Sequence, residues 1–232
     1  MKSTSIVLVP GLLCTGELYR HQIEALGADC LIADTLQDAT ITAMAERLLA
    51  EAPRRFVLCG LSMGGYVALE VMRLAPDRVF GLALMATSAR PDTPEQTEAR
   101  RRLIAFAARA GIAAVGDVLA DRLFAPEAAR DPVLRALTVT MAEAVGIQAF
   151  IRQQEAIIAR RDQTDLLSGV AAPTEVLAGI LDQIIDPARS REMAAAIPGA
   201  HLTMIEGGGH LVTLEAPDPA TAALRRLVAA AS

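Results

Sequence analysis

Ser62 is the candidate nucleophile of this chain, because it stands in a Gly-x-Ser-x-Gly pattern between two regular elements. The apolar run 56–59 comes before it, and a helical pattern over 66–74 comes after it. This order of strand, sharp turn and helix is called a nucleophile elbow. A side chain at Gly60 or Gly64 would collide with the neighbouring strand or helix, because the turn is so tight. The pattern predicts a serine oxygen above the carboxyl ends of the strands, where free helix N–H groups stabilise negative charge.

A serine hydroxyl is a weak nucleophile and needs a base, usually a histidine. The sequence offers His21, His201 and His210. We expect His21 on the surface of an early helix, and His201 at the solvent side or edge of the sheet. His210 follows the three glycines 207–209, just past the carboxyl end of an expected strand. Because Ser62 emerges at that same end of the sheet, His210 is the predicted base.

The third member of such a site is a carboxylate that holds the imidazole in the right tautomer and stabilises its charged form. Asp182 follows the expected strand 174–178, again at its carboxyl end. Asp186 is the alternative, but a proline follows it, and this pair is typical of a helix N-cap with proline at the first helical position. We therefore expect Asp182 to be the acid. Nucleophile, acid and base then follow one another in the order typical of an elbow serine.

Two backbone N–H groups are expected to receive the negative charge of a tetrahedral intermediate. One belongs to Met63, the residue after the nucleophile. The other comes from the loop after the first strand, residues 9–19, where Gly11 lets the backbone approach the site. Leu12 is the predicted second donor of this oxyanion hole, and Leu13 is the alternative.

The elements that must position these residues alternate between strand and helix along most of the chain. The segment 40–52, for example, carries apolar residues at helical spacing between two strands. Such alternation predicts a parallel sheet with helices on both faces, and the strands agree, since a strand buried on both faces has no polar side. The expected strands are 6–9, 30–33, 56–59, 79–85, 174–178 and 202–205.

The alternation stops between about residues 88 and 172, where we expect an insertion of roughly four helices. A capping box at 93–96, with proline at the first helical position, predicts a helix that ends at Gly111. A second helix start at Asp131 leads to Gly146, after which helical spacing continues. The insertion is therefore expected to be entirely helical.

The chain is expected to form one α/β domain, because 232 residues with 53% hydrophobic content are enough for a single sizeable core. The core is predicted to comprise residues 1–87 and 173–232, and a helical cap residues 88–172. The cap would lie above the end of the sheet where Ser62 emerges, which favours a lid; extra packing on the sheet edge is the alternative.

Composition excludes several classes of protein. A net charge of −5 without runs of like charge argues against a nucleic-acid surface. The early apolar run 6–13 is too short to span a membrane and contains proline and glycine, and we expect no targeting segment. Cys14, Cys30 and Cys59 lack Cys-x-x-Cys spacing, so neither disulfides nor zinc are expected. They are predicted to be small buried residues of a cytoplasmic protein.

Four segments together resemble the α/β-hydrolase superfamily, in particular its small esterase-like members related to pimeloyl-ACP methyl ester carboxylesterase and enol-lactonase. They are "LVPGLL", "GLSMGGYVALE", "VLAGILDQIID" and "IEGGGHLVTLEAPD". The resemblance covers nearly the whole chain and is weak in the cap. It implies a catalytic triad of Ser62, Asp182 and His210, with an oxyanion hole formed by Leu12 and Met63.

Two departures from that family accompany the resemblance. Pro10 stands where most relatives have the histidine of a His-Gly motif, so the geometry of the oxyanion loop is open. Only five residues precede the first strand, so the antiparallel hairpin that opens the usual eight-stranded sheet is expected to be missing. The expected sheet has about six strands, most of them parallel.

The implied activity is hydrolysis of carboxylic esters through an acyl-enzyme on Ser62, which needs no metal or organic cofactor. The partner is a small-molecule ester, and the apolar cap suggests a small to medium apolar group. Possible lining residues of the cap, which are also typical of a core, are Phe106, Phe124, Met141 and Phe150. Thioesterase, lactonase, acyltransferase and C–C hydrolase chemistry stay open on the same triad, as does a receptor of this fold without turnover.

Overall fold

The computed structural model describes residues 5–27 and 29–231, and a six-stranded parallel sheet forms its centre. The strands lie in the order β2-β1-β3-β4-β5-β6, and all neighbouring pairs are parallel. Their bounds are β1 (Ile6–Val9), β2 (Cys30–Ile32), β3 (Phe56–Leu61), β4 (Val79–Met85), β5 (Thr174–Gly179) and β6 (His201–Ile205). The predicted parallel α/β architecture and its six strands are confirmed, with strand ends that differ by at most two residues.

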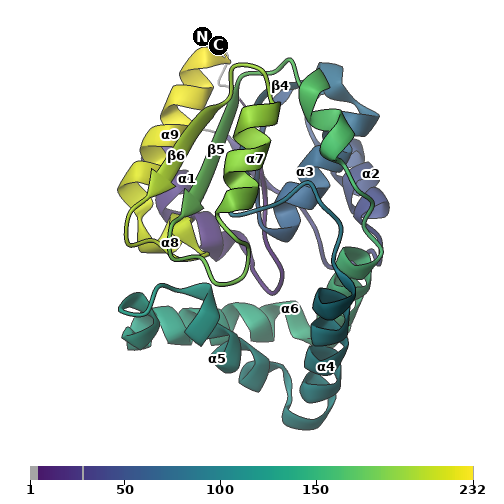
Figure 1. Cartoon of the computed structure of the whole chain (residues 1–232), viewed down its shortest axis with the longest axis vertical. Helices are drawn as coiled ribbons and strands as arrows, with labels where there is room; N and C mark the ends of the chain where they lie inside the picture. The colour runs from purple at the N-terminus through teal and green to yellow at the C-terminus, as the bar shows by residue number, and fades with distance from the viewer. Residues whose placement is uncertain (1–4, 28, 232) are drawn as a thin grey trace.

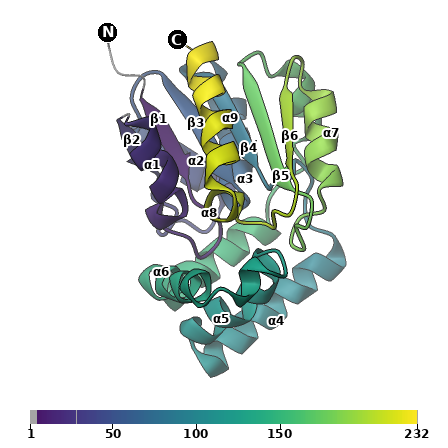
Figure 2. The ribbon, with the colours of Figure 1, turned by 90° about the vertical axis from the view of Figure 1, so that its left-hand side faces the viewer.

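Helices cover both faces of this sheet (Figures 1 and 2). One face packs against α2 (Ile41–Glu51), α3 (Met63–Leu74) and α7 (Ala188–Ala196). The other packs against α1 (Arg20–Leu26), α8 (Val212–Glu215) and α9 (Pro217–Ala230). The buried apolar residues of the central strands therefore face one of two apolar clusters, which explains the continuous apolar character of these strands.

The chain changes direction across the sheet between β1 and β3. From β1 it moves outward to β2, and it then crosses back to place β3 on the other side of β1. Val9 and Gly60 are register partners at the carboxyl ends of β1 and β3, so the loops that follow these strands start side by side. Ligand sites of parallel α/β sheets lie at such switch points. This position is where the Ser62 turn and the Gly11 loop meet.

Three longer helices lie beyond the carboxyl ends of the strands (Figures 1 and 2). They are α4 (Pro94–Ala110), α5 (Ile112–Leu123) and α6 (Pro132–Ile158). The capping box predicted at 93–96 is present. The Thr93 hydroxyl accepts a hydrogen bond from the Gln96 N–H, and the Gln96 amide oxygen accepts one from the Thr93 N–H. We call residues 88–172 the cap; their division from the core and their role as a lid stay predictions.

Helix α6 bends at Gly146, where φ is 76° and ψ is 160°. A positive φ costs glycine little, which is why the bend occurs at this residue. Asp131 caps the start of the helix through a hydrogen bond from the Val133 N–H. Among the described residues, α6 is long and apolar enough to cross a membrane by length and composition. Its buried side chains, such as Met141 and Phe150, pack instead within the protein interior.

Short 3-10 helices complete the described elements: η1 (Gly16–Tyr19), η2 (Pro76–Arg78), η3 (Ala128–Arg130) and η4 (Thr164–Gly169).

Candidate active site

Ser62 occupies a strained turn between β3 and α3. Its φ of 56° and ψ of −116° lie outside the regions that residues with side chains prefer. Hydrogen bonds hold the turn on both sides: the Ser62 N–H donates to the Met85 carbonyl at 2.9 Å, and the Thr87 hydroxyl donates to the Ser62 carbonyl at 2.8 Å. The strain is thus supported by β4 and the residues that follow it.

Gly60 and Gly64 permit this turn for steric reasons. A Cβ atom at Gly60 would overlap the backbone of Gly64 and Gly65 at the start of α3. A Cβ atom at Gly64 would overlap the Val9 carbonyl at the end of β1. The helix and the two strands can therefore approach this closely only where both positions lack a side chain.

Asp182 and His210 meet at the carboxyl ends of β5 and β6. The Nδ1 atom of His210 lies 2.8 Å from Oδ2 of Asp182, and both side chains are almost completely buried. The other carboxylate oxygen, Oδ1, accepts from the N–H groups of Ile184 and Ile185 at 2.8 and 3.0 Å. Because a carboxylate oxygen only accepts, the proton sits on Nδ1 of the neutral ring, and Nε2 keeps the lone pair that can take a proton.

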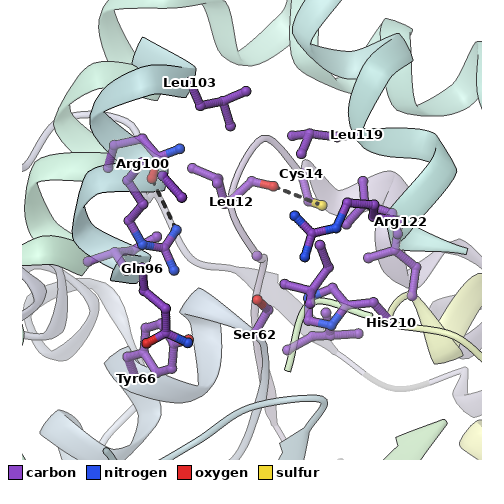
Figure 3. Close-up of a pocket in the computed structure, with 18 of the residues that line it drawn as sticks. Leu12, Cys14, Ser62, Tyr66, Gln96, Arg100, Leu103, Leu119, Arg122 and His210 are labelled. Atoms are coloured by element: carbon purple, nitrogen blue, oxygen red, sulfur yellow. Dashed lines mark hydrogen bonds between the residues drawn. The ribbon is translucent and has the colours of Figure 1, made fainter. Parts of the chain in front are cut away.

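Ser62 and His210 line the same cavity (Figure 3). No hydrogen bond joins their side chains among the described residues. Such bonds are often long before substrate binds and tighten in the complex. The structure thus brings together all three side chains that the sequence singled out.

The competing residues lie elsewhere. His21 is partly exposed on α1, and His201 is exposed at the start of β6, where its ring contacts Glu175. The Asp186 carboxylate accepts from the Ala188 N–H at 2.9 Å, and α7 begins at Ala188 with Pro187 at its N-cap, one residue later than predicted. These residues therefore have structural environments that do not include the cavity.

The loop after β1 approaches the serine turn closely. A Cβ atom at Gly11 would lie 3.2 Å from the Leu61 carbonyl oxygen and 3.4 Å from the Ser62 Cβ atom. The N–H groups of Leu12 and Met63, the two predicted oxyanion donors, have no hydrogen-bond acceptor among the described residues. Pro10, at the position of the usual family histidine, is buried at the end of β1.

Gln153 on α6 bonds to this loop, a contact that no local sequence pattern indicates. Its Oε1 atom accepts from the Leu13 N–H at 3.1 Å, and its Nε2 atom donates to the Thr35 carbonyl at 3.3 Å. Leu13 itself has a φ of 57°. The Leu13 N–H is thus occupied, which favours Leu12 over Leu13 as the predicted oxyanion donor.

A cavity of about 330 Å³ lies above Ser62, between the sheet and the cap. Its apolar wall includes Leu12, Leu103, Leu119 and Ile157, and its polar lining includes Gln96, Arg100, Arg122 and Gln154. None of the four cap residues suggested as lining reaches it. Phe124, Met141 and Phe150 are fully buried in apolar clusters. Phe106 is partly buried and packs against the cluster that contains Phe150.

Cys14 also lines the cavity, but burial raises the pKa of its thiol to about 12. It is therefore a neutral thiol near neutral pH and a poor nucleophile. Its Sγ atom donates to the Leu12 carbonyl at 3.4 Å. Cys59 is buried as expected, whereas Cys30 is only half-buried because β2 is an edge strand. Within residues 5–27 and 29–231, no cluster of His, Cys, Asp and Glu could hold a metal ion.

Glu215 connects the His210 loop to the cap. Its Oε2 atom accepts from the Gly209 N–H at 3.0 Å and from the Ala125 N–H at 2.7 Å. The His210 N–H donates to the Leu123 carbonyl at 3.0 Å, so the same two segments are joined twice. Burial raises the pKa of Glu215 more than the two backbone hydrogen bonds lower it. Its Oε1 atom is buried without a partner in the described part of the chain.

The raised pKa of Glu215 predicts a pH-dependent stability. The group stabilises the fold fully below its unfolded pKa, near 4.5, and that contribution is lost as the pH rises through the higher folded pKa. We expect the wild type to lose stability relative to Glu215→Gln as the pH rises from 4.5 to 8, so that the difference between their free energies of unfolding shifts in favour of the variant. Urea unfolding across this range measures the difference. Glu206→Gln is the control, because Glu206 is an exposed residue of the same loop. The same pH dependence of the free energy of unfolding in both variants would contradict the prediction.

Solved structures of esterase-type proteins share this architecture. A thermophilic esterase from Thermogutta terrifontis, solved with malate bound, is 30% identical with a TM-score of 0.89, covering 98% of this chain and 90% of that one. The enol-lactonase from Burkholderia xenovorans is 26% identical with a TM-score of 0.88, and the match covers 99% of this chain and 92% of the enol-lactonase chain. In sequence, the pimeloyl-[acyl-carrier protein] methyl ester esterase of Aromatoleum aromaticum is 28% identical over 190 residues, 77% of this chain and 76% of its own.

The family model described as "Alpha/beta hydrolase family" matches residues 6–224. This range begins with β1 and ends within α9, so it includes the whole sheet, the cap and the residues of the candidate site. The match agrees with the parallel sheet, the serine turn after β3 and the solved structures of the same fold. The chain therefore belongs to the α/β hydrolase family and is a hydrolase.

Proposed function

We propose that this hydrolase cleaves carboxylic esters of small to medium size through an acyl-enzyme on Ser62. The observation that carries the proposal is the buried pair of Asp182 and His210, whose histidine lines the same cavity as the strained Ser62. The N–H groups of Leu12 and Met63 have no acceptor among the described residues. These are the parts that acyl transfer requires: a nucleophile, a base held by an acid, and donors for the oxyanion.

In the first step, Nε2 of His210 takes the proton from the Ser62 hydroxyl while the serine oxygen attacks the ester carbonyl. The N–H groups of Leu12 and Met63 receive the negative charge of the tetrahedral intermediate. When the intermediate collapses, the bond to the alcohol oxygen breaks, and His210 returns its proton to the leaving alcohol. Water then attacks the acyl-enzyme with the same base, which releases the acid and restores Ser62.

The cavity supports the proposed size and character of the substrate. A volume of about 330 Å³ is at the lower end of the range of small-molecule sites. Leucine and isoleucine side chains form much of its wall, which favours an aliphatic acyl or alcohol chain. Relatives whose names describe esterases add support for the ester bond as the target.

A panel of p-nitrophenyl esters, thioesters and lactones of short and medium chain length tests the proposal. We expect ester turnover, together with a mass increase equal to the acyl group on the peptide that contains Ser62 after rapid quenching. A preference for thioesters or lactones would change the substrate class but keep the acyl-enzyme mechanism. Absence of turnover with every ester would contradict the proposal and favour a ligand receptor of the same fold.

A further inference from the structure

The cavity above Ser62 is lined by positive side chains and by no acidic ones. Arg100 from α4 and Arg122 from α5 both contribute to its wall, whereas no Asp or Glu among the described residues does so. Figure 3 shows the two guanidinium groups entering the space from opposite sides, with Ser62 below and between them. An apolar substrate alone gives no reason for this arrangement.

Arg100 belongs to a group with an excess positive charge. Its guanidinium and that of Arg160 share one carboxylate, Asp92, with closest N–O distances of 2.6 Å to each. Asp92 is almost completely buried, and Arg160 is nearly so. Two positive groups and one negative group leave one positive charge uncompensated beside the cavity. Low solvent exposure weakens the screening of this charge.

Gln154 on α6 supplies a second, independent observation. It is completely buried and lines the cavity. Its Oε1 atom accepts from Nη1 of Arg100 at 3.1 Å, while its Nε2 atom has no partner in the part of the chain that the structure describes. If the amide were turned over, its N–H bonds would point at the N–H bonds of the guanidinium, which is unfavourable. The unpaired atom is therefore the donor Nε2. A buried donor without an acceptor costs about 1–3 kcal/mol, and a ligand oxygen would remove that cost.

Arg100 also has donors to spare. Arginine has five N–H bonds, and the hydrogen bonds of Arg100 within the described residues go to Asp92 and Gln154. The remaining N–H bonds and the Nε2 atom of Gln154 are donors at the same part of the wall. A carboxylate has two oxygens that can accept from both.

Arg122 adds a positive charge on the other side. Its side chain is exposed, and its hydrogen bond goes to the Gln183 carbonyl at 2.7 Å, a neutral acceptor. No carboxylate of the described residues pairs with it. An exposed arginine at the mouth of a cavity attracts anions through its long-range field more than through a tight contact.

We propose that the substrate acyl chain carries a free carboxylate, which binds Arg100 and Gln154 while the ester carbonyl lies at Ser62. The inference rests on the proposed ester hydrolysis and names its substrate class: half-esters of aliphatic dicarboxylic acids. The apolar wall, which includes Leu103 and Ile157, contacts the methylene chain between the two ends. Water then converts the half-ester to the dicarboxylate and the free alcohol.

Matched pairs of esters test the proposal directly. The monomethyl esters of succinate, glutarate and adipate each differ from methyl butanoate, pentanoate and hexanoate only by a carboxylate in place of the terminal methyl group. We expect kcat/KM to be about ten- to a hundredfold higher for the half-ester than for the neutral ester in at least one pair, the value of one or two hydrogen bonds to a charged group. Equal or lower values for all three half-esters would overturn the inference.

Gln154→Glu is the decisive variant, because it keeps the size of the side chain and its acceptor for Arg100 but neutralises the excess charge. We expect the ratio of kcat/KM between half-ester and neutral ester to fall by about the same ten- to a hundredfold. Arg122→Gln is expected to lower the ratio less, and the difference is expected to shrink at high salt. Arg102→Gln is the control, since Arg102 lies exposed on α4 and its one ion pair within the described part of the chain is with Glu98. An equal change in this control would overturn the assignment.

Binding measurements separate this inference from the proposed activity. Calorimetric titration of Ser62→Ala with each half-ester and its neutral partner requires no turnover. Tighter binding of the half-ester, lost on adding Gln154→Glu, supports the carboxylate site even if no ester is hydrolysed. Equal binding of the two esters overturns the site even if both esters are good substrates of the wild type.

Discussion

Replacement of Ser62 by alanine is expected to lower kcat for ester hydrolysis by about 10⁶-fold, to the level set by binding and the oxyanion hole alone. The reason is that the hydroxyl is the only nucleophile of the proposed route. The neighbouring thiol of Cys14 cannot replace it, because burial keeps its pKa near 12. Initial rates with the best p-nitrophenyl ester, and mass spectrometry for the acyl adduct, measure the effect.

Ser190→Ala is a matched control for that variant. Ser190 is completely buried on α7, and its hydroxyl has no partner within residues 5–27 and 29–231. Its removal therefore breaks no hydrogen bond of the site, and we expect unchanged kcat. Turnover by Ser62→Ala within about tenfold of the wild type would show that the nucleophile lies elsewhere.

Replacement of Asp182 by asparagine is expected to lower kcat by about 10⁴-fold without loss of the fold. Oδ1 of Asp182 accepts from two backbone N–H groups, so the asparagine oxygen must stay at that position. The amide nitrogen then faces Nδ1 of His210, where the carboxylate oxygen lies in the wild type. Since Nδ1 must now accept, the ring proton moves to Nε2, and the ring can no longer take a proton from Ser62.

Asp186→Asn tests the alternative acid with the same chemical change. Asp186 accepts from the Ala188 N–H at the start of α7, and an asparagine oxygen can accept that bond as well. We expect nearly normal turnover from this variant. Full activity of Asp182→Asn together with a large loss in Asp186→Asn would assign the acid to Asp186. Circular dichroism of both variants checks that the folded structure is retained.

Much of the fold follows from local sequence patterns. Strands β1 and β4 have the bounds predicted from the sequence, because Pro10 ends the first apolar run and the second follows the turn residues Pro76 and Asp77. The start of α4 follows from the capping box at Thr93, and the bend of α6 from Gly146. These signals depend on backbone geometry within a few residues, so a sequence shows them directly.

The cap interior was not predictable in the same way. Helix α5 lacks a side-chain cap at its start, where Gly111 precedes it, so its beginning carried little signal. Aromatic residues suggested as cavity lining, such as Phe150, are core residues instead. Which face of a cap helix meets the cavity depends on how the helices pack against one another, and apolar spacing alone cannot separate a core face from a lining face.

The sequence by itself determined the sharp turn at Ser62, because the glycines at positions 60 and 64 are needed for steric reasons wherever the turn forms. Tertiary structure alone decided which other groups serve the site. Gln153 bonds Leu13 across 140 residues of chain, and Glu215 bonds Ala125 across 90. The cationic wall is likewise a product of cap packing, since Arg100 and Gln154 lie on different helices. Contacts of this range arise only when separate elements pack together, and no local pattern encodes them.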